Sequence, residues 1–260
     1  MLKRLFYATL IAGSLQITLA HAAAEDAAFT HAKHTLASAV IHGKLEELNK
    51  ARAEFSRLLA ADHSSTRLSY WVALSDWRIV PMVPDTAGGR AKKLCVEGIA
   101  ACDRVLVENP RDAGTLALKA ALQGMSLTYF PNLMMSLGPE MAVAYGTAEG
   151  IAPNDPRVIF LHALSTLYTP AQYGGGPEKA KPQFERSIAL FEKAKPDSTG
   201  IDWGHDDALL WSGRCLSRLN DWNGAKSRFT QVIARSPEHA WVRDVLLPEA
   251  AKHVADVGAK

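Results

Sequence analysis

The sequence predicts an all-α solenoid in which antiparallel helix hairpins stack one after another along the chain. Apolar residues recur at spacings of three and four, as they do along one face of a helix, and runs typical of strands are scarce. Prolines also stand at nearly even intervals, at Pro110, Pro153, Pro196 and Pro237. A period of about 20 to 50 residues is typical of repeat proteins, in which each unit packs on its neighbours.

The apolar periodicity, together with the loop-forming clusters between the periodic segments, predicts eleven helices. In order they cover residues 25–42, 44–61, 65–80, 89–108, 112–130, 139–151, 156–168, 177–194, 206–219, 222–235 and 238–256. These helices pair as five hairpins followed by one closing helix. The expected units of this single domain are 25–63, 64–110, 111–153, 154–196 and 197–237, with a cap over 238–257.

The last hairpin has the clearest repeat pattern. Gly213 and Ala225 are small, as is needed where two antiparallel helices cross closely, and Phe229 fills the space one turn later. Pro237 ends the second helix because it lacks an N–H and clashes with the preceding turn. Counted from Asp206, these residues stand at positions 8, 20, 24 and 32. The tetratricopeptide repeat family has small residues, an aromatic residue and proline there, so the hairpin resembles that family. The resemblance implies a right-handed solenoid.

The other units repeat this register less completely. It is represented, in chain order, by Ala51, Phe55 and Leu58, by Gly98, Cys102 and Val105, by Met141, Tyr145 and Ala148, and by Ala180 and Phe184. Extra residues fall in the connections around 81–89, 131–139 and 169–176, which lengthen the period beyond that of the family. In the last unit, the family's usual Trp, Leu and Tyr positions hold Leu209, Ser212 and Leu216.

The N-terminus is typical of a secretory signal peptide. Lys3 and Arg4 precede an apolar run over residues 5–20, and a small-x-small cleavage pattern follows at residues 20–22. We expect residues 1–22 to be removed and the protein to be periplasmic or secreted. An uncleaved N-terminal anchor is the alternative. No later segment approaches the length and hydrophobicity of a membrane span.

The charge balance argues against nucleic acid as a partner. The chain has 29 basic and 27 acidic residues, and loss of Lys3 and Arg4 leaves 27 of each. Binding to phosphates requires clustered positive charge, which this balance does not indicate. Long-range electrostatic steering of a partner is therefore expected to be weak.

The three cysteines, Cys95, Cys102 and Cys215, have no spacing typical of a zinc site. The first two are seven residues apart on one predicted helix, or roughly 10 Å at the helical rise, which exceeds the reach of a disulfide. In an exported protein one of them could pair with Cys215. We favour the alternative that all three are buried as small apolar residues.

Three consecutive glycines, at residues 174–176, follow Tyr173 and precede Pro177. Glycine permits positive φ angles and proline suits the first turn of a helix, so the stretch predicts a sharp turn between helices. Backbone amides in such a turn could instead hold an anion. The stretch lacks the Gly-Lys-Ser/Thr ending of a nucleotide-binding loop.

Two clusters are candidates for metal or catalytic sites. His31, His34 and His42 share a predicted helix but lack supporting carboxylates, which favours a solvated polar face. A denser cluster could bind a hard cation or perform acid–base chemistry and consists of Asp202, His205, Asp206 and Asp207. Because it lies at a predicted helix start, we favour capping by the aspartates and expect no metal, no cofactor and no catalytic residue.

Aromatic residues supply the binding candidates. Tyr70, Trp71 and Trp77 share a predicted helix with Arg78, and these residue types dominate binding hot spots. The family resemblance implies that the first helix of each pair lines the concave surface. The candidates for that surface are Arg67, Tyr70, Trp71, Arg78, Gln123 and Tyr168. The competing interpretation places Trp71, Trp77, Trp211 and Trp241 in the interhelical core.

The favoured function is a non-enzymatic scaffold of the bacterial envelope that binds a protein, a peptide or a small envelope ligand in its concave face. A solute-binding accessory of a membrane transporter is the alternative. A metal-binding protein or metal-dependent enzyme would have to use the cluster at Asp202–Asp207.

Overall fold

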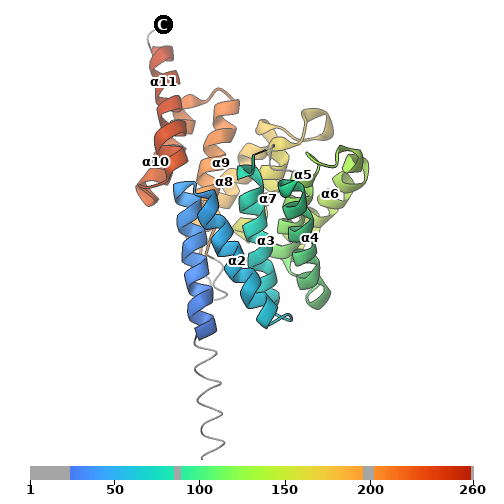
Figure 1. Cartoon of the computed structure of the whole chain (residues 1–260). Coiled ribbons are helices and arrows are strands. Elements are labelled where there is room, and N and C mark those ends of the chain that lie inside the picture. The colour runs from blue at the N-terminus through green and yellow to red at the C-terminus, as the bar shows by residue number, and fades with distance from the viewer. Residues whose placement is uncertain (1–23, 85–88, 196–201, 259–260) are drawn as a thin grey trace, which may run out of the picture.

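The protein is all-helical over the residues that the computed structural model describes, which are 24–84, 89–195 and 202–258 (Figure 1). A first helix over residues 24–42 precedes α2 (Leu45–Ala61), α3 (Thr66–Ile79), α4 (Arg90–Glu108), α5 (Ala113–Ser126), α6 (Met134–Ile151), α7 (Pro156–Tyr168), α8 (Pro177–Lys193), α9 (His205–Arg218), α10 (Trp222–Arg235) and α11 (Leu247–Gly258). No strand occurs in these described ranges.

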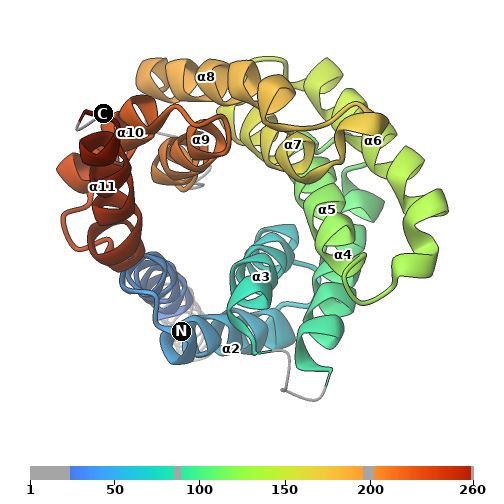
Figure 2. The same ribbon diagram turned by 90° about the horizontal axis from the view of Figure 1, so that it is seen from above.

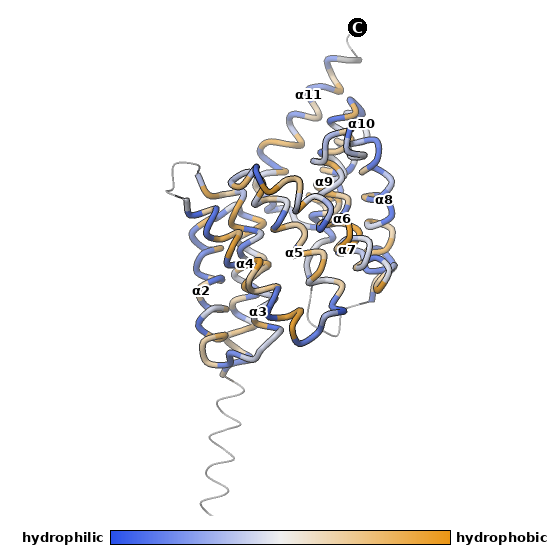
Figure 3. The backbone as a smooth tube through the Cα atoms, turned by 90° about the vertical axis from the view of Figure 1, so that its right-hand side faces the viewer, coloured by the Kyte–Doolittle hydropathy of each residue, from blue (hydrophilic) through white to orange (hydrophobic). Residues whose placement is uncertain are grey.

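The helices pack in consecutive antiparallel pairs that curve around a common centre (Figure 2). α3, α5, α7 and α9 form the inner layer, and α2, α4, α6 and α8 form the outer layer. In Figure 3 the inner helix α5 is largely hydrophobic, whereas the outer helices α2 and α8 carry long hydrophilic stretches. The all-α solenoid expected from the sequence is therefore confirmed.

Prolines and aspartates mark the junctions between successive pairs. Asp112 caps α5 by accepting a hydrogen bond from Thr115 N at 2.7 Å, and Asp155 caps α7 by accepting one from Arg157 N at 2.8 Å. Pro110 and Pro153 stand two residues before these caps. At these two junctions proline follows the end of one helix and aspartate satisfies a free amide of the next, whereas Pro196 lies outside the described residues.

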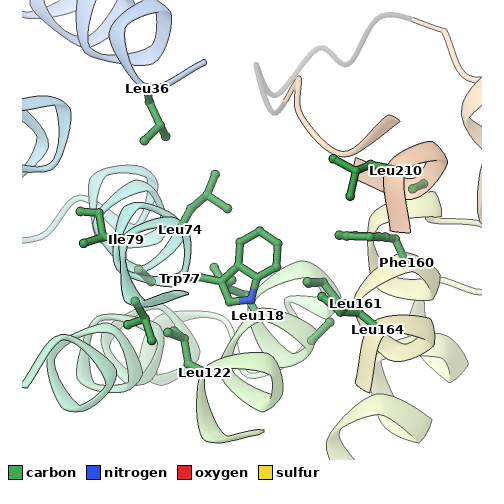
Figure 4. Packing of buried hydrophobic residues seen from close by; sticks show 14 of the residues in the cluster. Leu36, Leu74, Trp77, Ile79, Leu118, Leu122, Phe160, Leu161, Leu164 and Leu210 are labelled. Atoms are coloured by element: carbon green, nitrogen blue, oxygen red, sulfur yellow. The ribbon is translucent and has the colours of Figure 1, made fainter. Parts of the chain in front are cut away.

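The core is continuous through the stack and depends most on the inner layer. Every residue of α3 from Leu68 to Trp77 is buried. In Figure 4 the Trp77 indole points away from α3 toward the side of the molecule where α7 carries Phe160 and Leu161. The inner helices thus bury side chains on two sides, since each contacts its own partner and the next inner helix.

Two helix boundaries differ from the sequence prediction by more than two residues. α5 ends at Ser126 rather than near 130, and α6 begins at Met134 rather than 139, with Pro139 inside it. Pro139 is the sixth residue of α6, so the helix lacks the hydrogen bond that an N–H there would donate to the Met135 carbonyl. The last helix contains a π-helical turn over Val242–Leu246.

The described residues contain no helix long and apolar enough to cross a membrane. Residues 1–22, where the signal peptide is predicted, lie outside the described ranges. Cys95, Cys102 and Cys215 are buried and free, so the apolar interpretation holds and none is paired in a disulfide.

Candidate functional site

Two of the predicted binding residues, Tyr70 and Trp71, lie in the core rather than on an open surface. Their exposed fractions are 6% and 3%. Trp71 packs against the rings of Phe29 and Phe55, with centroids 5.9 and 5.5 Å away. The Tyr70 hydroxyl accepts a hydrogen bond from Trp203 Nε1 at 3.1 Å. Neither side chain is therefore free to contact a ligand in this structure, because other parts of the chain cover both.

Arg78 is also engaged within the chain. Its guanidinium forms a bidentate ion pair with Asp207, in which the second contact, from Nη2 to Oδ2, is 2.6 Å. The same group lies over the rings of Trp77 and Trp203, at 4.6 and 5.3 Å from their centroids. A charge-assisted pair with little solvent exposure fixes this arginine in place.

The remaining candidates occupy different environments. Arg67 is half-exposed, pairs with Asp26 and lies 4.2 Å over the Phe29 ring. Gln123 is buried, and its Nε2 lies 3.5 Å from Glu140 Oε2. Tyr168 stands out because 54% of it is exposed on the inner helix α7.

The acidic cluster at residues 202–207 does not converge on one point. Asp202 pairs with Lys33 at 3.2 Å, Asp206 bonds to Arg235 and Ser236, and Asp207 bonds to Arg78. Its side chains thus have separate cationic or hydroxyl partners. No group of three metal-ligating side chains occurs within the part of the chain that the structure describes.

Capping, the favoured role of the two aspartates, needs correction. The N-cap of α9 is Gly204, which makes no side-chain hydrogen bond, and Asp206 and Asp207 lie in the first turn. Gly204 has a φ of +112°, and a Cβ there would approach Phe191 to 2.7 Å. Only glycine suits this position. The aspartates complement the helix dipole and form ion pairs instead of capping free amides.

The glycine turn is structural, as favoured from the sequence. The amides of Gly174, Gly175 and Gly176 donate to the carbonyls of Ala171, Pro170 and Thr166, at 3.0, 3.3 and 2.9 Å. Because each amide already has a backbone acceptor, none is available to an anion.

Aromatic and arginine side chains lie next to one another around Tyr168. These side chains, which we call the aromatic–arginine surface, are Tyr168, Trp211, Arg214, Arg218 and Trp241. The ring of Trp211 makes edge contacts with Tyr168 at 5.9 Å and with Trp241 at 6.1 Å. Arg218 lies 4.5 Å over Tyr168, and Arg214 lies 5.8 Å over Trp241. Three rings and two cations thus form one continuous strip.

Helical geometry assembles this surface from three segments. Trp211, Arg214 and Arg218 are spaced by three and four residues, so they share one face of α9. Tyr168 is the last residue of α7, and Trp241 directly precedes the π-helical turn. Trp241 is 40% exposed and Arg218 is exposed, whereas Trp211 and Arg214 are half-buried.

The two arginines have no carboxylate partner among the described residues. Arg218 donates only to the carbonyl of Leu167, at 3.1 Å. Arg214 forms no hydrogen bond or ion pair in the described ranges, and its Nε is buried without an acceptor. Since buried donors are normally satisfied, Arg214 is an exception among the described residues.

The sequence prediction identifies Tyr168 and misses the rest of this surface. It weighs Trp211 and Trp241 as core residues, and it does not select Arg214 and Arg218. The spacing of the three α9 residues is the available signal, since an arginine three and seven residues after a tryptophan lies on its face.

Two comparisons with solved structures place the fold. A thermophilic TPR protein from Thermus thermophilus is similar, with a TM-score of 0.57, 13% identity, and coverage of 86% of this chain and 99% of that one. The HusA haemophore from Porphyromonas gingivalis is also similar, with a TM-score of 0.53, 25% identity, and coverage of 69% and 92%. No family model and no curated protein matches the sequence.

These similarities support a TPR-like helical fold. The resemblance seen in the last hairpin therefore extends to the architecture of the stack, although no family model matches the chain.

Proposed function

We propose that this protein is an exported, non-enzymatic scaffold that binds a protein or peptide segment through the aromatic–arginine surface. The observation that carries the proposal is the strip of three adjoining rings with two arginines that lack carboxylate partners among the described residues. Tryptophan, tyrosine and arginine are the residue types enriched at the centres of protein interfaces. TPR-like solenoids present such side chains on rigid helices.

The shape of the surface favours a macromolecular partner. Small ligands bind in clefts that bury most of their surface. Two surface hollows occur elsewhere: one lies between α3 and α4 around His63 and Arg104, and the other lies between α2 and α4 around Arg52 and Arg90. Neither includes a residue of the aromatic–arginine surface, whose three rings follow one another along a strip.

The charge of the surface favours an acidic segment that carries an apolar or aromatic residue. Arg214 and Arg218 would bind its carboxylates, and the rings would pack against its apolar side chain. Because the predicted mature chain has no net charge, this attraction acts at short range only. Binding should weaken with salt but should not vanish, since ring contacts are insensitive to screening.

The test is selection of peptides from a phage-displayed library against residues 23–260, followed by calorimetry with the selected peptides. We expect acidic sequences, and an affinity at least about tenfold weaker for the Arg214→Met, Arg218→Met double variant and for Trp241→Ala. Arg228→Met on α10 is the matched control because Arg228 bonds to Gln231, away from the surface. Equal binding to all variants would show that the ligand surface lies elsewhere.

A tetrapyrrole ligand is a second candidate, favoured by the similarity to the HusA haemophore at 25% identity. A flat ring with two carboxylates would also match aromatic side chains beside two arginines that lack carboxylate partners in the described ranges. Titration with haemin, followed by its absorbance, tests this candidate with the same variants. Saturable binding that the double variant loses would favour the tetrapyrrole over the peptide, and an absorbance change that never saturates would reject it.

Export is part of the proposal and rests on the N-terminal sequence. Fractionation of cells, followed by N-terminal sequencing, should find the protein outside the cytoplasm and beginning at residue 23. A full-length protein retained in the cytoplasm would contradict it.

A further inference from the structure

The segment Asp202–Asp207, which we call the inward segment, contacts α7 and also two helices that precede it by more than a hundred residues, the first helix and α3. Asp202 pairs with Lys33 of the first helix at 3.2 Å. The Trp203 indole N–H donates a hydrogen bond to the Tyr70 hydroxyl on α3. The backbone carbonyl of Trp203 accepts one from Arg157 Nε at 2.9 Å. Asp207 forms its bidentate pair with Arg78 at the end of α3.

The contacts of the inward segment are of the kinds that a protein makes with a bound peptide, namely ring packing and ion pairs. The Trp203 ring packs against Trp77 at 5.7 Å and Phe160 at 6.3 Å, so it serves as an aromatic anchor. A carboxylate on each side of this anchor meets a cation, Lys33 on one side and Arg78 on the other. An aromatic anchor with flanking ion pairs is the usual composition of a recognition hot spot.

The contacts between the inward segment and α3 are not among the nearest-neighbour helix contacts that stabilise a solenoid. Repeat units are stabilised by their own packing and by that of their nearest neighbours. α3 already packs against α2, α4 and α5, and α9 against α8 and α10. The contact between the inward segment and α3 instead links the second helix pair with the fifth.

One polar group at this contact is left unused. Trp77 is 4% exposed, and its Nε1 has no hydrogen-bond partner in the described ranges. A buried indole N–H normally finds an acceptor. The inward segment therefore fills the site without satisfying all of it, and a ligand with an acceptor at this position would bind better.

We propose that the inner face of α3, together with Lys33, is a second recognition site, specific for an acidic segment that carries an aromatic residue. The inward segment occupies this site as an internal ligand and keeps it closed. An external ligand must displace the inward segment, which competes at an effective concentration of about millimolar as part of the same chain. Binding here is thus autoinhibited.

The experiment uses a fluorescein-labelled peptide with the sequence of the inward segment, Asp-Trp-Gly-His-Asp-Asp. Its binding is followed by fluorescence polarisation up to millimolar protein. All proteins carry Arg214→Met and Arg218→Met, which weakens binding at the aromatic–arginine surface equally in every protein compared. The opened variant adds Trp203→Ala and Asp207→Asn. The control adds Trp222→Ala instead, since Trp222 stacks on His253 outside the site.

We expect the opened variant to bind the peptide at least about tenfold more tightly than the control, and Arg78→Met to remove this gain. Equal binding by the opened variant and the control, or no detectable binding by either, would overturn the proposal. Circular dichroism must show the same helix content in both. If the double change prevents folding, Asp207→Asn alone is used with hydrogen exchange. Faster exchange of α3 amides, suppressed by the peptide, supports the proposal, and unchanged exchange overturns it.

Discussion

The ring of Phe229 on α10 lies directly against Gly213 on α9. A Cβ at Gly213 would come within 2.4 Å of Phe229 Cε1, closer than such contacts ever are. The absence of a side chain at Gly213 therefore lets the fifth helix pair close over a fully buried phenylalanine. This pair is the unit whose sequence matches the repeat pattern best, so the packing reason for that pattern is visible here.

Replacing Gly213 by alanine should destabilise the protein by about 1–3 kcal/mol, because the added methyl group overpacks the crossing. The matched control is Gly146→Ala in α6, where no atom lies within 4 Å of the added Cβ. That change should stabilise the protein by about 0.5–1 kcal/mol, since alanine favours the helix. Urea unfolding of both variants checks this, and destabilisation by both would contradict the packing argument.

Arg52→Met should strongly destabilise the protein, by about 3 kcal/mol, because Asp76 would keep a buried carboxylate without its cation. The Asp76 side chain is fully buried, and burial raises its pKa to about 6 although Arg52 opposes this shift. Loss of Arg52 should raise that pKa further. The difference in free energy of unfolding between the wild type and Arg52→Met should therefore shrink as the pH falls from 8 to 5, since protonation of Asp76 removes the buried charge.

Arg57→Met is the control for that experiment. Arg57 also pairs with a carboxylate of α2, Glu54, but its side chain is 62% exposed. Its loss should change the free energy of unfolding far less. A deficit for Arg52→Met that does not depend on pH would mean that Asp76 is not the group responsible.

His239 should make stability decrease at acidic pH. It is 6% exposed with Nδ1 unpartnered among the described residues, and burial lowers its pKa below the usual value. At acidic pH the unfolded chain therefore binds a proton at His239 more readily than the folded chain does. The free energy of unfolding is unaffected by this group above about pH 6.5 and decreases as the pH falls below it. Between about pH 7 and 5, the free energy of unfolding should fall less in His239→Gln than in the wild type. Parallel pH profiles would exclude this role.

Substitutions in the glycine turn should distinguish two requirements for glycine, a lack of space for a Cβ and a positive φ. A Cβ on Gly175 would lie 2.1 Å from the carbonyl oxygen of Thr169, whereas Gly174 has open space but a φ of +84°. Asparagine tolerates positive φ, so Gly174→Asn should cost about 1 kcal/mol or less. Gly175→Ala should cost clearly more, because backbone must move. Thermal unfolding of the two variants decides, and the reverse order would contradict the steric account.

Local signals in the sequence are sufficient for the fold. Apolar spacing predicts the helices 156–168 and 222–235 with the bounds that the structure has, because both begin at clear capping residues. The start of α6 is predicted wrongly because Pro139 normally marks a helix start, and here a helix forms ahead of it.

The candidate site is less predictable because its accessibility depends on distant contacts. Tyr70 and Trp71 have hot-spot chemistry, and they are covered by Trp203 and by Phe29 with Phe55. No local pattern reveals that a segment more than a hundred residues later enters the same space. The inner-layer position of Tyr168 follows from the repeat register, but its pairing with Arg218 requires the relative rotation of α7 and α9.

The contact between the inward segment and α3 also bears on how the molecule loses its structure. A linear repeat array can fray from either end, because each terminal unit depends on one neighbour only. Here the Arg78–Asp207 pair joins units that are far apart in the array. Melting of one end should therefore disturb the other, and we expect the chain to unfold more cooperatively than an open repeat array of the same length.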